Sequence, residues 1–163
     1  MTALIYLFLM SLTLFVLPQI IVKILTGHPK FDKNILLLIL AAFLPIAWSF
    51  LPRELHGDRF INFLQHATGG GVAVGLVSIY FINSLKEKYP TLTHFFFQVL
   101  FFYALVSMFG VLNELLEFFL DYFEIGVFSS DRYDTWFDLL ANTTGSVTIF
   151  VLYRIRQLIY SWF

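Results

Sequence analysis

The 163-residue chain contains no cysteine, and only 13% of its residues are charged. The absence of cysteine excludes disulfides and thiolate zinc sites. The low charge excludes an ordinary soluble domain of this length, because such a domain needs more charged side chains to cover its surface. Lys and Arg number 10 against 11 Asp and Glu, so no large basic field indicates nucleic acid as a partner.

Apolar residues are abundant, at 59% of the chain, and 21 residues are phenylalanine. Lipid favours an apolar exterior, and crossing the hydrocarbon of a bilayer takes about twenty mainly apolar residues. Five stretches qualify: residues 3–25, 34–51, 59–83, 92–121 and 135–154. The first is too long for the apolar core of a signal peptide, so we expect it to stay as an anchor. We therefore predict an all-α polytopic membrane protein with five transmembrane helices in a single domain, residues 1–163.

Basic residues divide unevenly between the two sides of this five-span arrangement. The side with the first loop, the third loop and the C-terminus carries seven of them: Lys23, Lys30, Lys33, Lys86, Lys88, Arg154 and Arg156. The opposite side carries three: Arg53, Arg59 and Arg132. Short loops rich in Lys and Arg stay in the cytoplasm. We therefore expect the N-terminus outside and the C-terminus in the cytoplasm, in the cell (inner or plasma) membrane.

Polar residues follow helical stripes in the predicted third, fourth and fifth spans. With spacings of three and four residues, each stripe lies on one helix face. The stripes are Asn62, His66 and Gly70; Glu114, Glu117 and Asp121; and Asp134, Asp138 and Asn142. At 1.5 Å per residue, His66, Glu114 and Asn142 come about 10–12 Å below the outer face. We predict that the three helices turn these stripes toward one pocket open to the outside.

An ionised carboxylate at mid-bilayer costs about 2.5–3.5 kcal/mol, so these acids should line a wet cavity or meet a partner. Two carboxylates one helical turn apart also repel, and one must hold a proton unless a cation lies between them. The candidate metal ligands are His66, Glu114, Glu117 and Asp138. Oxygen ligands with one imidazole suit a divalent cation such as Mg²⁺, Mn²⁺ or Ca²⁺, and Zn²⁺ is possible.

Further residues are candidates for ligand binding, and some of the polar pattern has a simpler explanation. The candidate ligand-binding residues are Arg59, Asn62, Arg132, Asp134 and Asn142. Asp134 followed by Thr135 also suits the start of a helix, where a side-chain oxygen accepts free backbone amide protons. Asp121 is expected among solvated headgroups, and the glycines at 69–71 are expected to allow close helix packing.

Three segments, DRFINFLQHATGGG, NELLEFFLD and DTWFDLLANTTGS, resemble the VanZ-like superfamily and related uncharacterised bacterial inner-membrane proteins. Those proteins have an Asp with a basic neighbour and a following His, then a Glu-rich span end, then a D-x-x-x-D-x-x-x-N-x-x-G helix. The matching residues here are Asp58, Arg59, His66, Glu114, Glu117, Asp134, Asp138, Asn142 and Gly145. The resemblance implies a small envelope protein, and some members are associated with reduced sensitivity to glycopeptide antibiotics.

Three functions fit these features. The leading hypothesis is a cation-binding membrane module that engages the headgroup of an envelope lipid or lipid-linked glycan, with Arg59 or Arg132 meeting an anionic group. The second is a metal-dependent hydrolase or transferase acting on a lipid-linked phosphate or sugar, in which Glu114, Glu117 and His66 position a metal-activated water. Against it, the chain has no nucleophile elbow, H-E-x-x-H pair or phosphate-binding glycine loop. The third is a structural subunit whose acids pair with a basic membrane protein partner.

Overall fold

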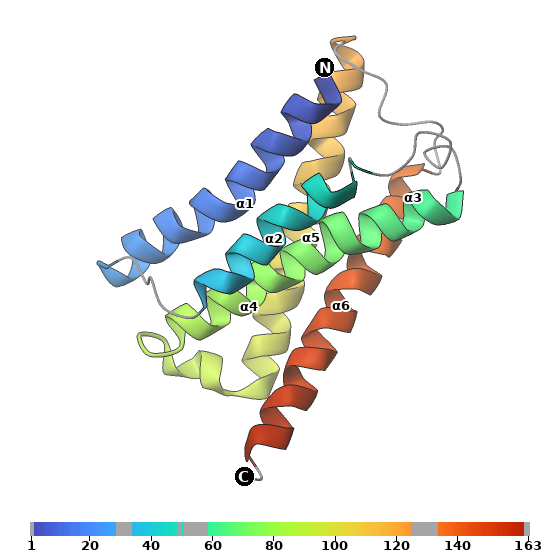
Figure 1. The fold of residues 1–163 in the computed structure, drawn as a ribbon. Helices are drawn as coiled ribbons and strands as arrows, with labels where there is room; N and C mark the ends of the chain where they lie inside the picture. The colour runs from blue at the N-terminus through green and yellow to red at the C-terminus, as the bar shows by residue number, and fades with distance from the viewer. Residues whose placement is uncertain (1, 29–33, 49, 51–58, 125–133, 162–163) are drawn as a thin grey trace.

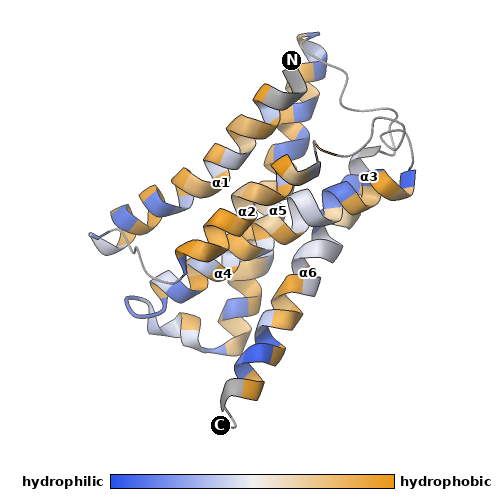
Figure 2. Ribbon diagram, viewed as in Figure 1, coloured by the Kyte–Doolittle hydropathy of each residue, from blue (hydrophilic) through white to orange (hydrophobic). Residues whose placement is uncertain are grey.

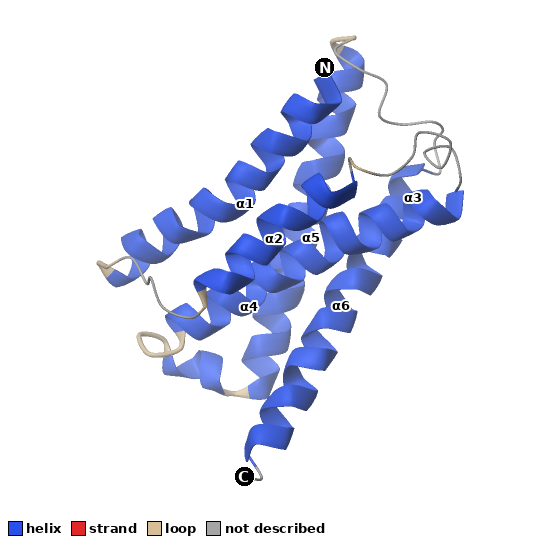
Figure 3. Ribbon diagram, viewed as in Figure 1, coloured by secondary structure: helices blue, strands red, loops and turns tan. Residues whose placement is uncertain are grey.

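A computed structural model describes residues 2–28, 34–48, 50, 59–124 and 134–161. Every regular element in these ranges is a helix, so the all-α prediction is confirmed for the described chain (Figure 3). The elements are α1 (Thr2–Thr26), α2 (Ile35–Trp48), α3 (Arg59–Gln65), the π-helix η2 (His66–Val72), α4 (Ala73–Leu85), the 3₁₀-helix η3 (Pro90–Thr93), α5 (Phe95–Tyr122) and α6 (Asp134–Ser161).

The helix α4 forms the centre of the molecule. It continues α3 and η2 as one rod, and it contacts α1, α2, α5 and α6, which surround it (Figure 1). Its side chains are buried all round, with Val77, Tyr80 and Ile82 fully enclosed. A helix that is apolar on every face is suited to this central position.

Glycines bring η2 and α6 into close contact. A Cβ added at Gly71 would overlap the backbone oxygen of Asn142, and one at Gly145 would overlap the backbone oxygen of Ala67. The Ser146 hydroxyl also donates a hydrogen bond of 2.7 Å to the Gly71 carbonyl. The predicted role of the glycines at 69–71 in close helix packing is therefore confirmed at Gly71.

Three helices are long and apolar enough to cross a membrane among the described residues: Ile5–Thr26, Arg59–Leu85 and Phe95–Tyr122. The apolar helix α2 is shorter, at 14 residues. The helix α6 has 28 residues, but polar side chains lower the hydropathy of its first half. Two of them, Asp138 and Asn142, are only 3% and 8% exposed. A hydropathy average therefore understates how well the outer surface of α6 suits lipid.

Large apolar side chains cover the outside of the bundle. Ile24 on α1 is 75% exposed, and Phe96 and Phe118 on α5 are 69% and 61% exposed. Figure 2 shows apolar residues along most of α1, α2 and α4, with hydrophilic residues gathered toward helix ends. This distribution is compatible with a membrane protein, because lipid favours the apolar exterior that water does not.

Candidate metal site

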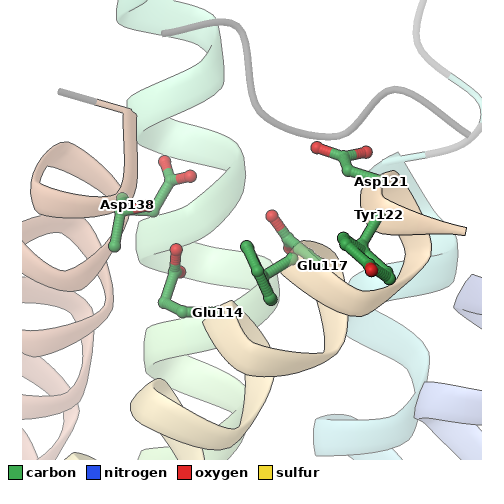
Figure 4. Close-up of a pocket in the computed structure, with 7 residues that line it drawn as sticks. Glu114, Glu117, Asp121, Tyr122 and Asp138 are labelled. Carbon is green, nitrogen blue, oxygen red and sulfur yellow. The ribbon is translucent and has the colours of Figure 1, made fainter. Parts of the chain in front are cut away.

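Three acidic side chains meet between α5 and α6. Glu114 and Glu117 of α5 and Asp138 of α6 each offer a carboxylate oxygen, and these oxygens all lie within 4.8 Å of one another. We call these three residues the carboxylate cluster. Asp138 is 3% exposed and Glu117 is 9% exposed. Figure 4 shows the Glu114 and Asp138 side chains reaching toward each other from the two helices, with Glu117 beside them.

The carboxylate cluster lines a cavity of about 320 Å³. The cavity is lined by Glu114, Glu117, Phe118, Asp121, Tyr122, Thr135 and Asp138. Asp121, which the sequence placed on the same stripe and among solvated headgroups, lies at the same cavity as the cluster (Figure 4). Its position four residues after Glu117 indicated this from the sequence, whereas nothing in the sequence pointed to Phe118 or Tyr122.

The helix α3 and the start of η2 place two polar side chains against Asp138. The Asn62 amide nitrogen donates to Asp138 Oδ1 at 3.5 Å. His66 Nε2 lies 3.5 Å from the same oxygen. The two residues are four apart, so one helix face directs both toward α6. His66 therefore lies next to a member of the carboxylate cluster, and its role as a direct metal ligand stays a prediction.

Two residues that the sequence did not single out connect α1 to the cluster. The Tyr6 hydroxyl donates to Asn113 Oδ1 at 2.7 Å, and Asn113 Nδ2 donates to Glu117 Oε1 at 2.8 Å. Asn113 lies four residues before Glu117, so this stripe was visible in the sequence. Tyr6 is 107 residues away from Asn113 along the chain, so no spacing rule relates the two.

The remaining predicted ligand-binding residues lie in different places. Asn142 is 8% exposed, and its Oδ1 is buried without a hydrogen-bond donor among the residues the structure describes. Arg59 is exposed at the start of α3, one turn before Asn62. Asp134 begins α6, and only its backbone is described. Arg132 and Asp58 lie outside the described residues.

Repulsion between the carboxylates of the cluster is relieved by a proton or by a bound cation. Two unit charges 4.8 Å apart repel by roughly 3 kcal/mol at an effective dielectric constant of about 20. A positive charge between the carboxylates offsets this repulsion. Oxygen ligands of Ca²⁺ lie about 2.3–2.6 Å from the ion, so two of them are at most about 5 Å apart. The spacing within the cluster fits that limit.

No family model, curated protein or solved structure matches the chain. The resemblance to the VanZ-like superfamily therefore stays a prediction. Functional conclusions follow from the geometry of the site.

Proposed function

We propose that this protein is an integral protein of the cell (inner or plasma) membrane that binds a divalent cation at the carboxylate cluster. Three apolar helices and the exposed apolar side chains support the membrane location. In this proposal α2 and α6 also cross the membrane, which gives five spans, with the N-terminus outside and the C-terminus in the cytoplasm. The cluster then faces the outside.

One observation carries the cation proposal: three carboxylate oxygens from two facing helices lie within 4.8 Å of one another beside a cavity. Carboxylates are hard oxygen ligands, so the cluster suits Mg²⁺, Mn²⁺ or Ca²⁺ better than a softer metal. The buried Asn142 oxygen, one turn below Asp138 on the same stripe of α6, lies against Gly70 and is not part of the cavity lining. A buried acceptor without a donor costs about 1–3 kcal/mol, which a water or ligand nearby would offset.

The second part of the proposal is that the bound cation engages an anionic lipid or glycolipid headgroup. A Ca²⁺ ion takes about 6–8 oxygen ligands, so three carboxylates leave positions that phosphate oxygens can fill. The cavity is bordered by Phe118 and Tyr122, which are 61% and 70% exposed and suit contact with lipid. In this proposal Arg59, exposed one turn before Asn62 on α3, meets a negative group of the same ligand.

The cation proposal is tested by titrating the purified protein in detergent with Mn²⁺. Binding is measured by calorimetry and by the electron paramagnetic resonance signal of the free Mn²⁺. Glu114→Gln removes one ligand charge at nearly constant shape. The Mn²⁺ affinity of this variant should fall by at least about 100-fold, because even residues that only orient metal ligands contribute about 10–100-fold to affinity. The matched control is Glu87→Gln, at an exposed glutamate outside the site, and it should bind as the wild type does. Equal Mn²⁺ affinity in wild type and Glu114→Gln contradicts the proposal.

The position of His66 favours a second candidate function, a metal-dependent hydrolase or transferase acting on a lipid-linked phosphate or sugar. The His66 imidazole lies 3.5 Å from Asp138, and in this function it would accept a proton from a water activated by a metal that the carboxylate cluster would hold. The enzyme hypothesis is supported if the wild type turns over such a substrate and His66→Ala loses this turnover but still binds Mn²⁺. Mn²⁺ binding without turnover supports the binding module. A basic membrane protein that copurifies, with no Mn²⁺ binding, supports a structural subunit.

A further inference from the structure

We infer that Tyr6 is a positioning residue of the carboxylate cluster and acts on Glu117 through the Asn113 side chain. The inference rests on the proposed cation site and adds α1 to it. Two hydrogen bonds carry it, one of 2.7 Å from the Tyr6 hydroxyl to Asn113 Oδ1 and one of 2.8 Å from Asn113 Nδ2 to Glu117 Oε1.

The two bonds have one direction. An amide has one acceptor oxygen and one donor nitrogen. Because Asn113 accepts from the phenol, its nitrogen is turned toward the carboxylate, where a donor is needed. If the amide were reversed, its oxygen would face the carboxylate oxygen and repel it. The acceptor-only Glu117 carboxylate therefore sets the amide orientation, and the Tyr6 hydroxyl holds the amide in it by donating to Asn113 Oδ1.

The helix α1 makes this contact although it is distant from α5 along the chain. Its main packing partners are α2 and α4. The Tyr6 hydroxyl is thus a polar link from α1 to α5. The start of α1 lies beside the end of α5 (Figure 1). A long, flexible side chain such as Glu117 loses rotamer freedom when it binds an ion. Fixing one of its oxygens beforehand reduces that loss and raises cation affinity.

Linkage gives the contact a second consequence. If the bond from Tyr6 raises cation affinity by some factor, the bound cation strengthens the contact between α1 and α5 by the same factor. Cation occupancy and the position of the first helix are then coupled. The cluster would respond to anything that moves the outer half of α1.

The test measures Mn²⁺ affinity in a double-mutant cycle. Tyr6→Phe keeps the ring and removes the hydroxyl, and its affinity should fall about tenfold, the lower end of the effect of partners that orient metal ligands. Asn113→Ala should lower affinity at least as much, since it removes both bonds. In the Asn113→Ala background, Tyr6→Phe should have a smaller effect, because only the direct interaction between Tyr6 and Glu117 remains. The matched control is Tyr103→Phe, at a tyrosine of α5 that is 64% exposed, and it should leave affinity unchanged.

The outcomes separate this inference from the proposed function. If the wild type and Tyr6→Phe bind Mn²⁺ equally well, the role of Tyr6 is overturned and the cation site remains supported. Additive losses in the cycle overturn the route through Asn113. Wild-type protein that binds no Mn²⁺ overturns the cation site and this inference together. If Tyr6→Phe does not fold, unchanged Mn²⁺ affinity in Asn113→Ala overturns the inference by itself.

Discussion

Asp138 is the member of the carboxylate cluster with the most varied surroundings. It faces two glutamates of α5, and it contacts Asn62 and His66 from the preceding helices. At 3% exposure it is nearly enclosed, so a charge there needs compensation by polar neighbours or an ion. This residue joins the three helices whose polar stripes were expected to meet.

Substitutions at Asp138 and His66 distinguish a ligand from a residue that orients one. Asp138→Asn should lower Mn²⁺ affinity by at least about 100-fold, whereas His66→Ala should lower it about tenfold. Titration calorimetry measures both. His94→Ala, at an exposed histidine beside α5, serves as the control and should bind normally. A loss in His66→Ala as large as that in Asp138→Asn would make the imidazole a direct ligand.

Metal removal should lower stability. A cation at about 100 times its dissociation constant stabilises the folded state by about 2.7 kcal/mol, if it binds only that state. Thermal unfolding in detergent should therefore shift to lower temperature when EDTA replaces Mn²⁺. In Glu114→Gln the two midpoints should coincide. A shift of the same size in that variant would place the stabilising ion elsewhere.

At the scale of elements, the contact between η2 and α6 decides where the cluster lies. Stripes with α-helical spacing predicted that Asn62 and His66 share a face, and both do contact Asp138. The spacing rule ends at His66, where the π-helix begins and the hydrogen bonds change to i→i+5. The sequence HATGGGV gave no indication of this change, because glycine fits many backbone conformations.

The close packing of α6 on η2 should be sensitive to a single methyl group. At Gly145 a Cβ would overlap the backbone oxygen of Ala67, which cannot move without shifting a helix. Gly145→Ala should therefore destabilise the protein by about 1–3 kcal/mol, the usual cost of overpacking. Thermal unfolding in detergent measures it.

Gly110→Ala is the matched control for that substitution. Its Cβ would lie 3.3 Å from Leu139 Cδ2, the end of a side chain that can adjust. It should change stability by less than about 1 kcal/mol, within the range that cores absorb by small adjustments. Equal stability of Gly145→Ala and wild type would show that α6 can withdraw from η2 without cost.

At the scale of the whole molecule, the charges of the loops predict the membrane orientation. The chain has no cysteine, so a single introduced cysteine is a unique label. Phe123→Cys, after α5, should react with a membrane-impermeant maleimide in intact cells. Lys88→Cys, between α4 and α5, should react only after the membrane is permeabilised. Both positions are exposed, so burial does not affect the comparison. The reverse pattern would invert the protein and place the cluster on the cytoplasmic side.

The sequence alone determined the helical class and the grouping of acids on single helix faces. Composition sets the preferred solvent, and a period of about 3.6 residues fixes which side chains share a face. Only the tertiary structure decided which faces meet. It brought Glu114 and Asp138 together beside one cavity, and it added Tyr6 from the far end of the chain. Spacing along one helix is local, whereas the relative placement of helices depends on how side chains from distant segments pack.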